Sequence, residues 1–468
     1  MKRTITLGIA AICLAVGLCV GNATAEPRFL DQSFEAKVII DGLENPWNLC
    51  VAPDGWLWVS ERTGKRITRV NPETGEKKVA LTIDEAYPDQ GHQGVLGFAL
   101  TPGFLEKGNP NYFYVVYTYM EGKDGDYKKI VRYEYDAKSE TLKNPQPILE
   151  KIPAGDDHEG GRLVYGPDGK LYLSLGELGH NQFGNACKPI EAQRLPTQQE
   201  VNDKDWAAYV GKVLRVNLDG TIPEDNPALD GVKSHIFTYG HRNPQGLVFV
   251  GKNLFECEHG PSSDDELNLL AAGGNYGWPY VAGFQDDEAY VYANYSAAKD
   301  CQNVKWDANV IPEGVPVQKE SEWKAPNNFV PPIKTFWTVR NGYPFHDGDK
   351  YGEMAYAKWP TVAPSSVNYY PVDGPIEPLR NSLLITTLKT GLIIQIPLTL
   401  SQDNVQGTVY THFKTPNRYR TLCVSDDGLS LYVTTDSYGT ATDYNLVPTD
   451  KVANPGAIIK YTYKPAAK

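Results

Sequence analysis

Short runs in which hydrophobic and polar residues alternate, separated by turn residues, make up most of this chain. Residues 51–60, 165–174 and 424–434 nearly match one another, and each reads as a strand, an Asp-Gly turn and a second strand. This pattern predicts a β-hairpin. Looser copies follow at residues 95–117, at 248–256, and at 382–388 with 366–370 as the possible partner strand. Long runs with helical periodicity are scarce, so the pattern predicts an all-β fold.

A further alternating run follows each hairpin and predicts a third strand. These runs lie at residues 67–70, 130–135, 213–218, 266–270, 392–398 and 458–463. Six units of the same order predict a six-bladed β-propeller of four-stranded antiparallel sheets, in which small sheets pack face to face around an axis. A β-sandwich is the structural alternative, but it does not explain six units with the same internal order.

The repeat also predicts where the functional residues gather. The segment before each first strand and the residues after each second strand are expected on one face, close to the propeller axis. The segments before the first strands are residues 45–47, 91–94, 157–162, 241–246, 359–361 and 417–420. The residues after the second strands include Glu61, Glu177, Glu258, His259, Lys389 and Asp436. Most of the distinctive polar residues therefore converge on one mouth, which predicts a functional pocket there.

The N-terminus predicts export. Lys2 and Arg3 precede an apolar run over residues 5–20, and small residues at 23–25 offer a cleavage site. Residues 1–25 are therefore expected to be a signal peptide and residues 26–468 a single propeller domain, which is periplasmic or secreted. The apolar run is too short for a membrane anchor, and no later stretch reaches a spanning length.

Charge and cysteine content narrow the functional classes. The formal net charge of −12 disfavours nucleic acid and anionic lipid as partners. Five cysteines follow the signal, so at least one is free, and small buried hydrophobes are the favoured interpretation for most of them. These cysteines are Cys50, Cys187, Cys257, Cys301 and Cys423. The sequence has no compact cluster of His and Cys residues that would predict a zinc site, and it has no glycine-rich motif for binding phosphate or a dinucleotide.

His158 is the strongest catalytic candidate. It lies between Asp157 and Glu159 at a pocket position of the repeat, and Glu177 is expected on the same mouth. A carboxylate bonded to one ring nitrogen would fix the tautomer and leave the other nitrogen free to accept a proton, as a general base requires.

Cations at pocket positions indicate an anionic ligand rich in oxygens, because Arg offers planar donor forks and Lys a point charge. These cations are Arg242, Lys389, Arg418 and Arg420. Phosphate, a sugar acid or a carboxylated cofactor would each suit them. The acidic segment at residues 258–266, with Asp286, Asp287 and Glu320, suits calcium, although solvated acidic loops explain it equally well.

Several separate motifs closely resemble the soluble quinoprotein glucose dehydrogenases, to which the shorter aldose sugar dehydrogenases are related. The resemblance runs from about residue 35 to the C-terminus. Its motifs are residues 162–169, 211–220, 240–247, 273–279, 293–298, 319–323, 359–366 and 417–420.

The resemblance implies pyrroloquinoline quinone and calcium as cofactors. Arg242 and Asn243 would address the quinone oxygens, and quinone and carboxylate oxygens would be held by Thr361, Lys389, Arg418 and Arg420. The carbonyls of Gly260 and Pro261 would bind the cofactor calcium, which would polarise the quinone as a Lewis acid. A second calcium region, near a homodimer contact, would comprise Glu266, Tyr276, Ala282, Asp286 and Glu320.

The implied activity is oxidation of an aldose, such as glucose, at its C1 hydroxyl to a lactone. His158 would take the hydroxyl proton while C1 delivers hydride to the quinone carbon beside Arg242, and an unidentified external acceptor would reoxidise the quinol. Glu177 would orient His158, and Gln182 would bind sugar hydroxyls. Tyr356 and Trp359 would form an apolar wall for the sugar.

Three departures from the family pattern stand out. His92 replaces a glutamine near the sugar, and Glu177 replaces an aspartate, which leaves the preferred aldose and the pH dependence open. Tyr351 and Lys358 replace a cysteine pair, so no disulfide is expected there.

Two alternatives to the dehydrogenase remain. One is a calcium-dependent propeller lactonase, against which Arg418 and Arg420 argue, because a neutral lactone needs no such cations. The other is a non-catalytic carbohydrate-binding propeller, against which His158 with Glu177 argues.

Overall fold

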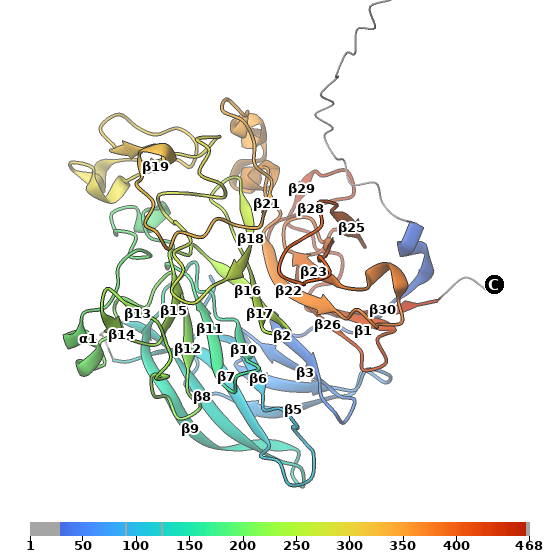
Figure 1. Ribbon diagram of the computed structural model, residues 1–468. Helices are drawn as coiled ribbons and strands as arrows, with labels where there is room; N and C mark the ends of the chain where they lie inside the picture. Colours follow the sequence, from blue (N-terminus) through green and yellow to red (C-terminus); the bar gives the residue numbers. More distant parts are fainter. Residues whose placement is uncertain (1–28, 89–90, 123–124, 465–468) are drawn as a thin grey trace, which may run out of the picture.

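Six four-stranded antiparallel sheets form a six-bladed β-propeller (Figure 1). The computed structural model describes residues 29–88, 91–122 and 125–464, so the predicted signal peptide lies outside the described residues. The prediction of an all-β propeller is confirmed, and all six predicted hairpins and third strands are present. Among the described residues, no helix has the length and apolar character needed to cross a membrane.

The first five blades each use four strands in sequence order, from the axis outward. Blade 1 contains β2 (Pro46–Val51), β3 (Leu57–Glu61), β4 (Arg66–Val70) and β5 (Lys77–Thr82). Blade 2 contains β6 (Val95–Leu100), β7 (Tyr112–Met120), β8 (Asp126–Asp136) and β9 (Thr141–Pro153). Blade 3 contains β10 (Leu163–Tyr165), β11 (Leu171–Leu175), β12 (Lys212–Val216) and β15 (Ile236–Tyr239).

Blades 4 and 5 follow the same rule. Blade 4 contains β16 (Pro244–Val250), β17 (Asn253–Glu258), β18 (Asp265–Leu270) and β21 (Lys334–Phe336). Blade 5 contains β22 (Pro364–Tyr370), β23 (Ser382–Thr387), β24 (Ile393–Pro397) and β25 (Tyr410–His412).

The sixth blade joins the two ends of the described chain. It contains β26 (Tyr419–Val424), β27 (Ser430–Thr435), β30 (Ile458–Tyr463) and, at its outer edge, β1 (Phe34–Ile40). Strand β1 pairs antiparallel with β30, from Phe34 opposite Tyr463 to Ile40 opposite Ile458. The N-terminal strand therefore closes the ring, a pairing that the repeat pattern did not reveal.

The hydrophobic core is divided among the blade interfaces. Six of the buried apolar clusters each join two neighbouring blades; in one of them Trp58 of blade 1 packs against Phe113 of blade 2. Burial of apolar area against the neighbouring sheet stabilises each blade by about 25 cal/mol per Å². Alternation along each strand thus supplies one hydrophobic layer per interface.

β-bulges at the start of the inner strands turn side chains toward the axis. The register of β2, β16, β22 and β26 shifts around Trp47, Gln245, Ser365 and Arg420, respectively. A bulge re-aims a side chain and leaves a main-chain group unpaired. Hydroxyls at the end of the second strand satisfy such groups: Ser60 Oγ accepts from Asn48 N at 3.0 Å and Thr434 Oγ1 from Thr421 N at 3.2 Å.

Arg162 lies buried at the axis and connects several blades. Its guanidinium donates to Asn48 Oδ1 at 2.5 Å, to the Gln245 carbonyl at 3.0 Å and to the Ser365 carbonyl at 3.0 Å, and it lies over the Trp47 ring. Burial lowers the pKa of Arg162 to about 9. This side chain therefore ties blades 1, 3, 4 and 5 together beneath the mouth.

The segments outside the blades contain few and mostly short regular elements. They comprise the helix α1 (Gln198–Asp203), the two-stranded pairs β13 (Ala228–Leu229) with β14 (Val232–Lys233), β19 (Tyr292–Ala293) with β20 (Val317–Gln318) and β28 (Ala441–Thr442) with β29 (Pro448–Thr449). The 3-10 segments are Phe29–Ser33, Phe183–Asn185, Tyr295–Ala297, Cys301–Asn303, Glu320–Glu322, Phe345–Lys358 and Glu377–Leu379.

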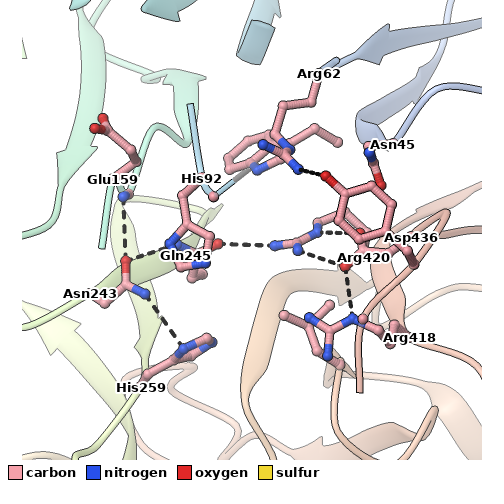
Figure 2. Close-up of a pocket in the computed structure, with 16 residues that line it drawn as sticks. Asn45, Arg62, His92, Glu159, Asn243, Gln245, His259, Arg418, Arg420 and Asp436 are labelled. Carbon is pink, nitrogen blue, oxygen red and sulfur yellow. Dashed lines mark hydrogen bonds and ion pairs between the residues drawn. The ribbon is translucent and has the colours of Figure 1, made fainter. Parts of the chain in front are cut away.

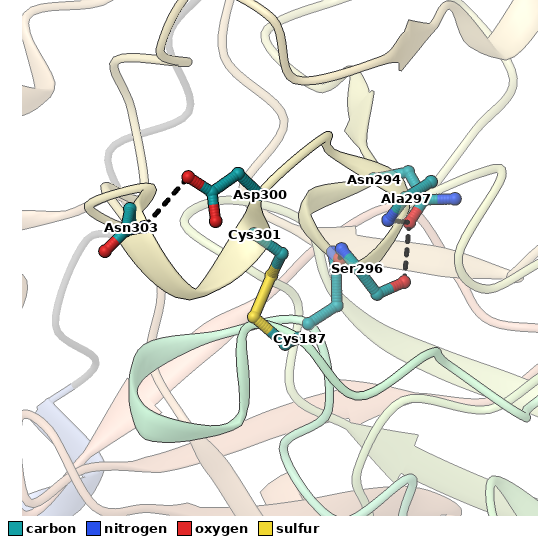
Figure 3. The surroundings of a disulfide bond; sticks show 8 residues. Cys187, Asn294, Ser296, Ala297, Asp300, Cys301 and Asn303 are labelled. Atoms are coloured by element: carbon teal, nitrogen blue, oxygen red, sulfur yellow. Dashed lines mark hydrogen bonds between the residues drawn. A yellow bond between two sulfur atoms is a disulfide. The ribbon is translucent and has the colours of Figure 1, made fainter.

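One disulfide links two of the segments outside the blades. Cys187 follows β11, and Cys301 belongs to the long insertion between β18 and β21 (Figure 3). Cys50, Cys257 and Cys423 are free cysteines, and Cys257 is buried. Of the five cysteines among the described residues, two therefore form a disulfide and three are free thiols.

Candidate active site

The predicted mouth is a cavity with about 660 Å³ of empty space, open to solvent and lined by residues from all six blades (Figure 2). Its lining includes Asn45, Trp47, Arg62, His92, Glu159, Asn243, Gln245, His259, Leu388, Arg418, Arg420, Asp436 and Tyr438. The bulged residues Trp47, Gln245 and Arg420 are among them. The backbone irregularity of the inner strands thus helps to explain why side chains from distant blades meet.

His158 and Glu177 form a close, buried pair; neither residue lines this cavity, but His92 and Glu159, which are next to His158, do. His158 Nδ1 lies 2.5 Å from Glu177 Oε1, and the two residues are 5% and 1% exposed. Glu177 is itself fixed, because its Oε2 accepts from His180 N at 2.9 Å. A carboxylate at Nδ1 favours the tautomer in which Nδ1 carries the proton and Nε2 is an unprotonated acceptor, which here lies 3.3 Å from the Gln182 amide nitrogen. Nε2 therefore has the state that a general base requires.

The main chain beneath this pair is unusually tight. Gly176 lies next to the His158 carbonyl, and a Cβ at Gly176 would lie 1.8 Å from that oxygen. Any side chain there would push the β11 end, which carries Glu177, away from His158. Glycine is therefore required at this position for the close approach.

Three further predicted residues belong to the same network. Gln182 Nε2 lies 3.3 Å from His158 Nε2, and Gln182 Oε1 accepts from the Arg242 guanidinium at 3.3 Å. His92 Nδ1 accepts from His158 N at 3.1 Å and lies 3.1 Å from Asp157 Oδ1. The structure thus brings together His92, His158, Glu177, Gln182 and Arg242.

Arg242 and Asn243 form the wall on blade 4. Arg242 donates from its guanidinium to the His259 carbonyl at 3.2 Å, while its buried Nε has no hydrogen-bond partner among the described residues. Asn243 Oδ1 accepts from Gly160 N at 3.3 Å, and its amide nitrogen lies 3.5 Å from His259 Nδ1. Burial and the nearby Arg242 lower the pKa of His259 well below its ordinary value, so this imidazole is neutral.

Blades 1 and 6 supply a cationic wall. Arg418 and Arg420 both pair with Asp436, at 3.1 Å and 2.8 Å, and Arg62 lies near them with its guanidinium 3.3 Å from the Tyr438 hydroxyl (Figure 2). Three guanidinium groups thus gather around a single carboxylate, with which only Arg418 and Arg420 form ion pairs. The remaining positive charge suits an anionic ligand with planar oxygen groups.

The predicted residues of blade 5 form a separate contact group. Lys389 Nζ donates to Thr361 Oγ1 at 2.7 Å and to the Trp359 carbonyl. The Tyr356 and Trp359 rings lie 6.3 Å apart, and Tyr356 is exposed. The neighbour Leu388 lines the cavity, whereas these four residues do not. The structure therefore places them close to one another and outside the lining of this cavity.

Most of the predicted calcium residues lie around a small cavity below Arg242. That cavity is lined by Gly260, Pro261, Glu266, Tyr276 and Ala282, together with Arg242, Glu258, His259 and Trp278. Glu320 accepts from Ala282 N at 3.0 Å and from Asp286 N at 3.2 Å, which brings the remaining two predicted residues to the same region. The Tyr276 hydroxyl is already bonded to the Leu269 carbonyl at 2.8 Å, so only its main-chain carbonyl could serve as a ligand.

The electrostatics of this region favour a cation. Burial raises the pKa of Glu320 to about 7, and burial together with the neighbouring Glu258 raises the pKa of both Glu256 and Glu266. The Asn268 amide nitrogen lies 2.9 Å from Glu256, 3.4 Å from Glu258 and 3.0 Å from Glu266, and His241 Nδ1 lies 2.9 Å from Glu258 Oε1. One neutral amide and one imidazole cannot neutralise three buried carboxylates. An oxygen-rich, negatively charged pocket of this kind fits calcium.

Sequence reasoning missed several residues of the site. Arg62 and Tyr438 each lie one or two residues beyond the predicted Glu61 and Asp436, so a slightly longer segment after each second strand would have included them. Asn45 and Gln245 fell within predicted segments but received no role. His241, Glu256 and Glu258 also form a buried group whose ligand atoms lie within 4.8 Å of one another.

A family model and individual relatives match this chain to sugar dehydrogenases. The sequence model described as Glucose / Sorbosone dehydrogenase matches residues 43–331. Quinoprotein glucose dehydrogenase B of Acinetobacter calcoaceticus is 46% identical over 444 residues, which cover 92% of each chain. Aldose sugar dehydrogenase YliI of Escherichia coli is 28% identical over 304 residues, covering 62% of this chain and 72% of that one.

A solved structure of a related enzyme has the same fold. The PQQ-bound form of an aldose sugar dehydrogenase from Streptomyces coelicolor is 25% identical, with a TM-score of 0.60, and the match covers 92% of this chain and 98% of that chain.

Proposed function

Because this chain belongs to the glucose/sorbosone dehydrogenase family, whose quinoprotein glucose dehydrogenase member covers nearly its whole length, we propose that it is a quinoprotein aldose dehydrogenase. Its substrate class is an aldose such as glucose, oxidised at the C1 hydroxyl to a lactone. The proposed cofactors are pyrroloquinoline quinone and calcium.

The observation that carries the proposal is the His158–Glu177 pair at 2.5 Å on the edge of an arginine-lined cavity. Glu177 holds the proton on Nδ1, so Nε2 can accept the proton of the sugar C1 hydroxyl. Glu177 then stabilises the imidazolium that forms, because it lies buried against the ring. Gln182, 3.3 Å from Nε2, is placed to bind a hydroxyl of the same sugar.

The cavity fits a flat tricarboxylate. Arg62, Arg418 and Arg420 supply donor forks on one wall, and the buried Nε of Arg242 lacks a partner among the described residues. Arg242 and Asn243 would hold the quinone oxygens, and Thr361, Lys389, Arg418 and Arg420 the other oxygens, although Thr361 and Lys389 would first have to exchange their present contacts. When bound, pyrroloquinoline quinone supplies the two-electron acceptor that protein side chains cannot provide.

Calcium is proposed on the blade 4 side of the cavity. Gly260 and Pro261 would offer main-chain carbonyls beside the quinone. Glu266, Asp286 and Glu320, with the carbonyls of Tyr276 and Ala282, would form the second site. The raised pKa of Glu320 and Glu266 supports the proposal, because a divalent cation would stabilise their ionised forms.

We further propose that residues 1–25 direct export to the periplasm or beyond, and that the chain forms a homodimer near the second calcium region. An external electron acceptor would reoxidise the cofactor. These proposals rest on the sequence of the N-terminus and on the family.

The test is reconstitution of the calcium-free apoprotein with calcium and pyrroloquinoline quinone. Dye reduction with glucose or other aldoses, with lactone as product, is expected. Absence of dye reduction with every aldose, together with absence of quinone binding, would overturn the proposal. Lactone hydrolysis without dye reduction would support the lactonase instead.

His158→Ala tests the proposed base. It should abolish turnover and leave quinone binding intact, which absorbance titration of the apoprotein measures. Turnover close to the wild-type rate would show that another residue is the base.

A further inference from the structure

The turn that carries His158 is held from behind by a lysine of the neighbouring blade. Lys128 of β8 donates from Nζ to the main-chain carbonyl of Glu159 at 2.7 Å. The same Nζ forms an ion pair with Glu159 Oε2 at 2.5 Å. The two side chains are 0% and 1% exposed. A buried ion pair carries a large desolvation cost and is retained only where both charges are well paired.

The backbone at this turn needs such support. His158 has φ 42°, and Gly160 and Gly161 have φ 62° and 95°, so three of four successive residues lie in the left-handed region. A residue with a Cβ is strained in that region. The Glu159 carbonyl that Lys128 binds lies between these residues. Glu159 also holds the start of the turn in place, because its Oε1 accepts a hydrogen bond from Gly155 N.

Lys128 itself cannot reach a sugar or a cofactor, because its side chain is fully buried beneath the turn. Its effect on chemistry must pass through the Glu159 carbonyl and the backbone to the His158 ring. That ring needs to keep Nδ1 within hydrogen-bond distance of Glu177 Oε1 on blade 3 while its Nε2 stays beside Gln182.

We propose that Lys128 is a positioning residue for the base: it fixes the Glu159 carbonyl and thereby keeps the His158 imidazole aligned with Glu177. The inference deepens the proposed function and rests on it, since it assigns His158 as the base. It also predicts that blade 2, which supplies His92 to the mouth, controls turnover through a buried contact.

The first experiment compares Lys128→Met with wild type. Displacement of the base by about 1 Å can lower a rate on the order of 10²-fold, so kcat should fall by about 10- to 100-fold. KM for the sugar and the affinity for pyrroloquinoline quinone should change little, because no ligand contact is removed.

A second variant separates positioning from stability. Lys128→Met leaves Glu159 buried without its cation and should lower the melting temperature. The double variant K128M/E159Q removes both charges and should regain most of that stability. Its kcat should stay low, because the Glu159 carbonyl still lacks its donor. A double variant with wild-type kcat would overturn the inference.

Lys129→Met is the matched control. Lys129 is the next residue of β8 and is also largely buried and ion-paired, but its partners are Glu85 at 3.0 Å and Glu150 at 3.6 Å, away from the His158 turn. The kcat of Lys129→Met should match that of the wild type. A loss as large as that of Lys128→Met would show that any lysine deletion on this strand has the effect, and would also overturn the inference.

The proton between His158 Nδ1 and Glu177 gives a readout that needs no cofactor. A donor–acceptor distance of 2.5 Å should give a strongly downfield proton NMR signal in the apoprotein, absent in His158→Ala. The signal should persist in Lys129→Met and broaden or vanish in both Lys128 variants. If wild type oxidises no aldose, the proposed function fails, whereas an unchanged signal in K128M/E159Q contradicts the positioning role itself.

Discussion

At the scale of single residues, the site depends on buried charges that neighbours hold in place. Glu177 is buried between the His158 ring and the His180 amide, and Arg418 and Arg420 share Asp436. Each of these groups is polar and largely removed from water, so its geometry is set by its hydrogen-bond partners. Small changes in side-chain length should therefore have measurable effects on turnover.

Glu177→Gln should lower kcat by about 10²- to 10⁴-fold, because the neutral amide cannot stabilise the imidazolium and can favour the wrong tautomer. Glu177→Asp keeps the charge and should cost less than about 10-fold. Steady-state kinetics of the reconstituted protein measures both. Equal losses in the two variants would indicate that the length of residue 177, rather than its charge, is what matters.

The raised pKa of Glu320 predicts that stabilisation of the protein by calcium depends on pH. Burial raises the pKa of Glu320 from 4.5 to about 7 in the calcium-free protein. A carboxyl with a raised pKa in the folded state contributes stability below its unfolded pKa, and this contribution is lost as the pH rises toward the folded pKa. Calcium binds the ionised form, so the calcium-induced rise in melting temperature should be larger at about pH 7.5 than at about pH 5.5.

Differential scanning calorimetry with calcium and with a chelator measures this difference. Glu320→Gln, which cannot ionise, should show a smaller rise at both pH values. A calcium effect that is independent of pH would contradict the assignment of Glu320 as a ligand.

Many of the residue positions were predictable, whereas their contacts were not. The repeat predicted His158, Glu177, Arg242 and Arg418 on one face of the propeller, because the order of the strands fixes which of their ends emerge on the same face. Sequence could not show that Lys128, which no motif marks, lies under Glu159. That contact depends on how blade 2 packs against blade 3.

At the scale of elements, the same contact recurs in several blades: a hydroxyl at the end of the second strand accepts a hydrogen bond from a main-chain N–H near the start of the inner strand. Ser174, at the end of one repeat, accepts from Arg162 N at 3.0 Å and donates to the Pro244 carbonyl at 2.9 Å. Ser60 has the same double role between blades 1 and 2, where its hydroxyl donates to the Leu96 carbonyl at 2.7 Å. The serine that ends each of these two motifs thus satisfies a main-chain N–H of its own blade and joins that blade to the next one.

Ser174→Ala should lower the free energy of unfolding by about 1–3 kcal/mol, because a buried N–H and a buried carbonyl lose their partner. Urea denaturation measures the change. Ser139→Ala serves as the control, since Ser139 is exposed and bonds only to its own turn residues Asp136 and Thr141. A loss of similar size in both variants would show that the buried contacts are not responsible.

At the scale of the whole molecule, the disulfide joins the segment that follows β11 to the insertion of blade 4. Cys187 follows the loop with Glu177 and Gln182, and Cys301 lies 114 residues later in the segment that leads to Glu320. The sequence left the cysteine pairing open, because pairing across such a distance depends on the folded path of both segments. The propeller, in contrast, was predictable, since each repeat specifies its own hairpin.

Removal of this disulfide should lower stability substantially. Closing a loop of this length corresponds to about 4–5 kcal/mol of chain entropy, and measured values are commonly about 2–4 kcal/mol. The melting temperature of C187S/C301S should therefore fall well below that of Cys257→Ser, which removes a free buried thiol. A double variant as stable as wild type would show that packing alone holds the insertion in place.

The pairing of β1 with β30 makes the polypeptide nearly circular in space. The two ends of the described chain meet in one sheet, so the position of the chain break is not essential to the architecture of the ring. A linker from residue 464 to residue 34, with a new break at an exposed interblade turn far from the mouth, should give a circular permutant that still folds. Such a permutant would allow an electrode-binding or redox-partner domain to be attached at any blade of the ring.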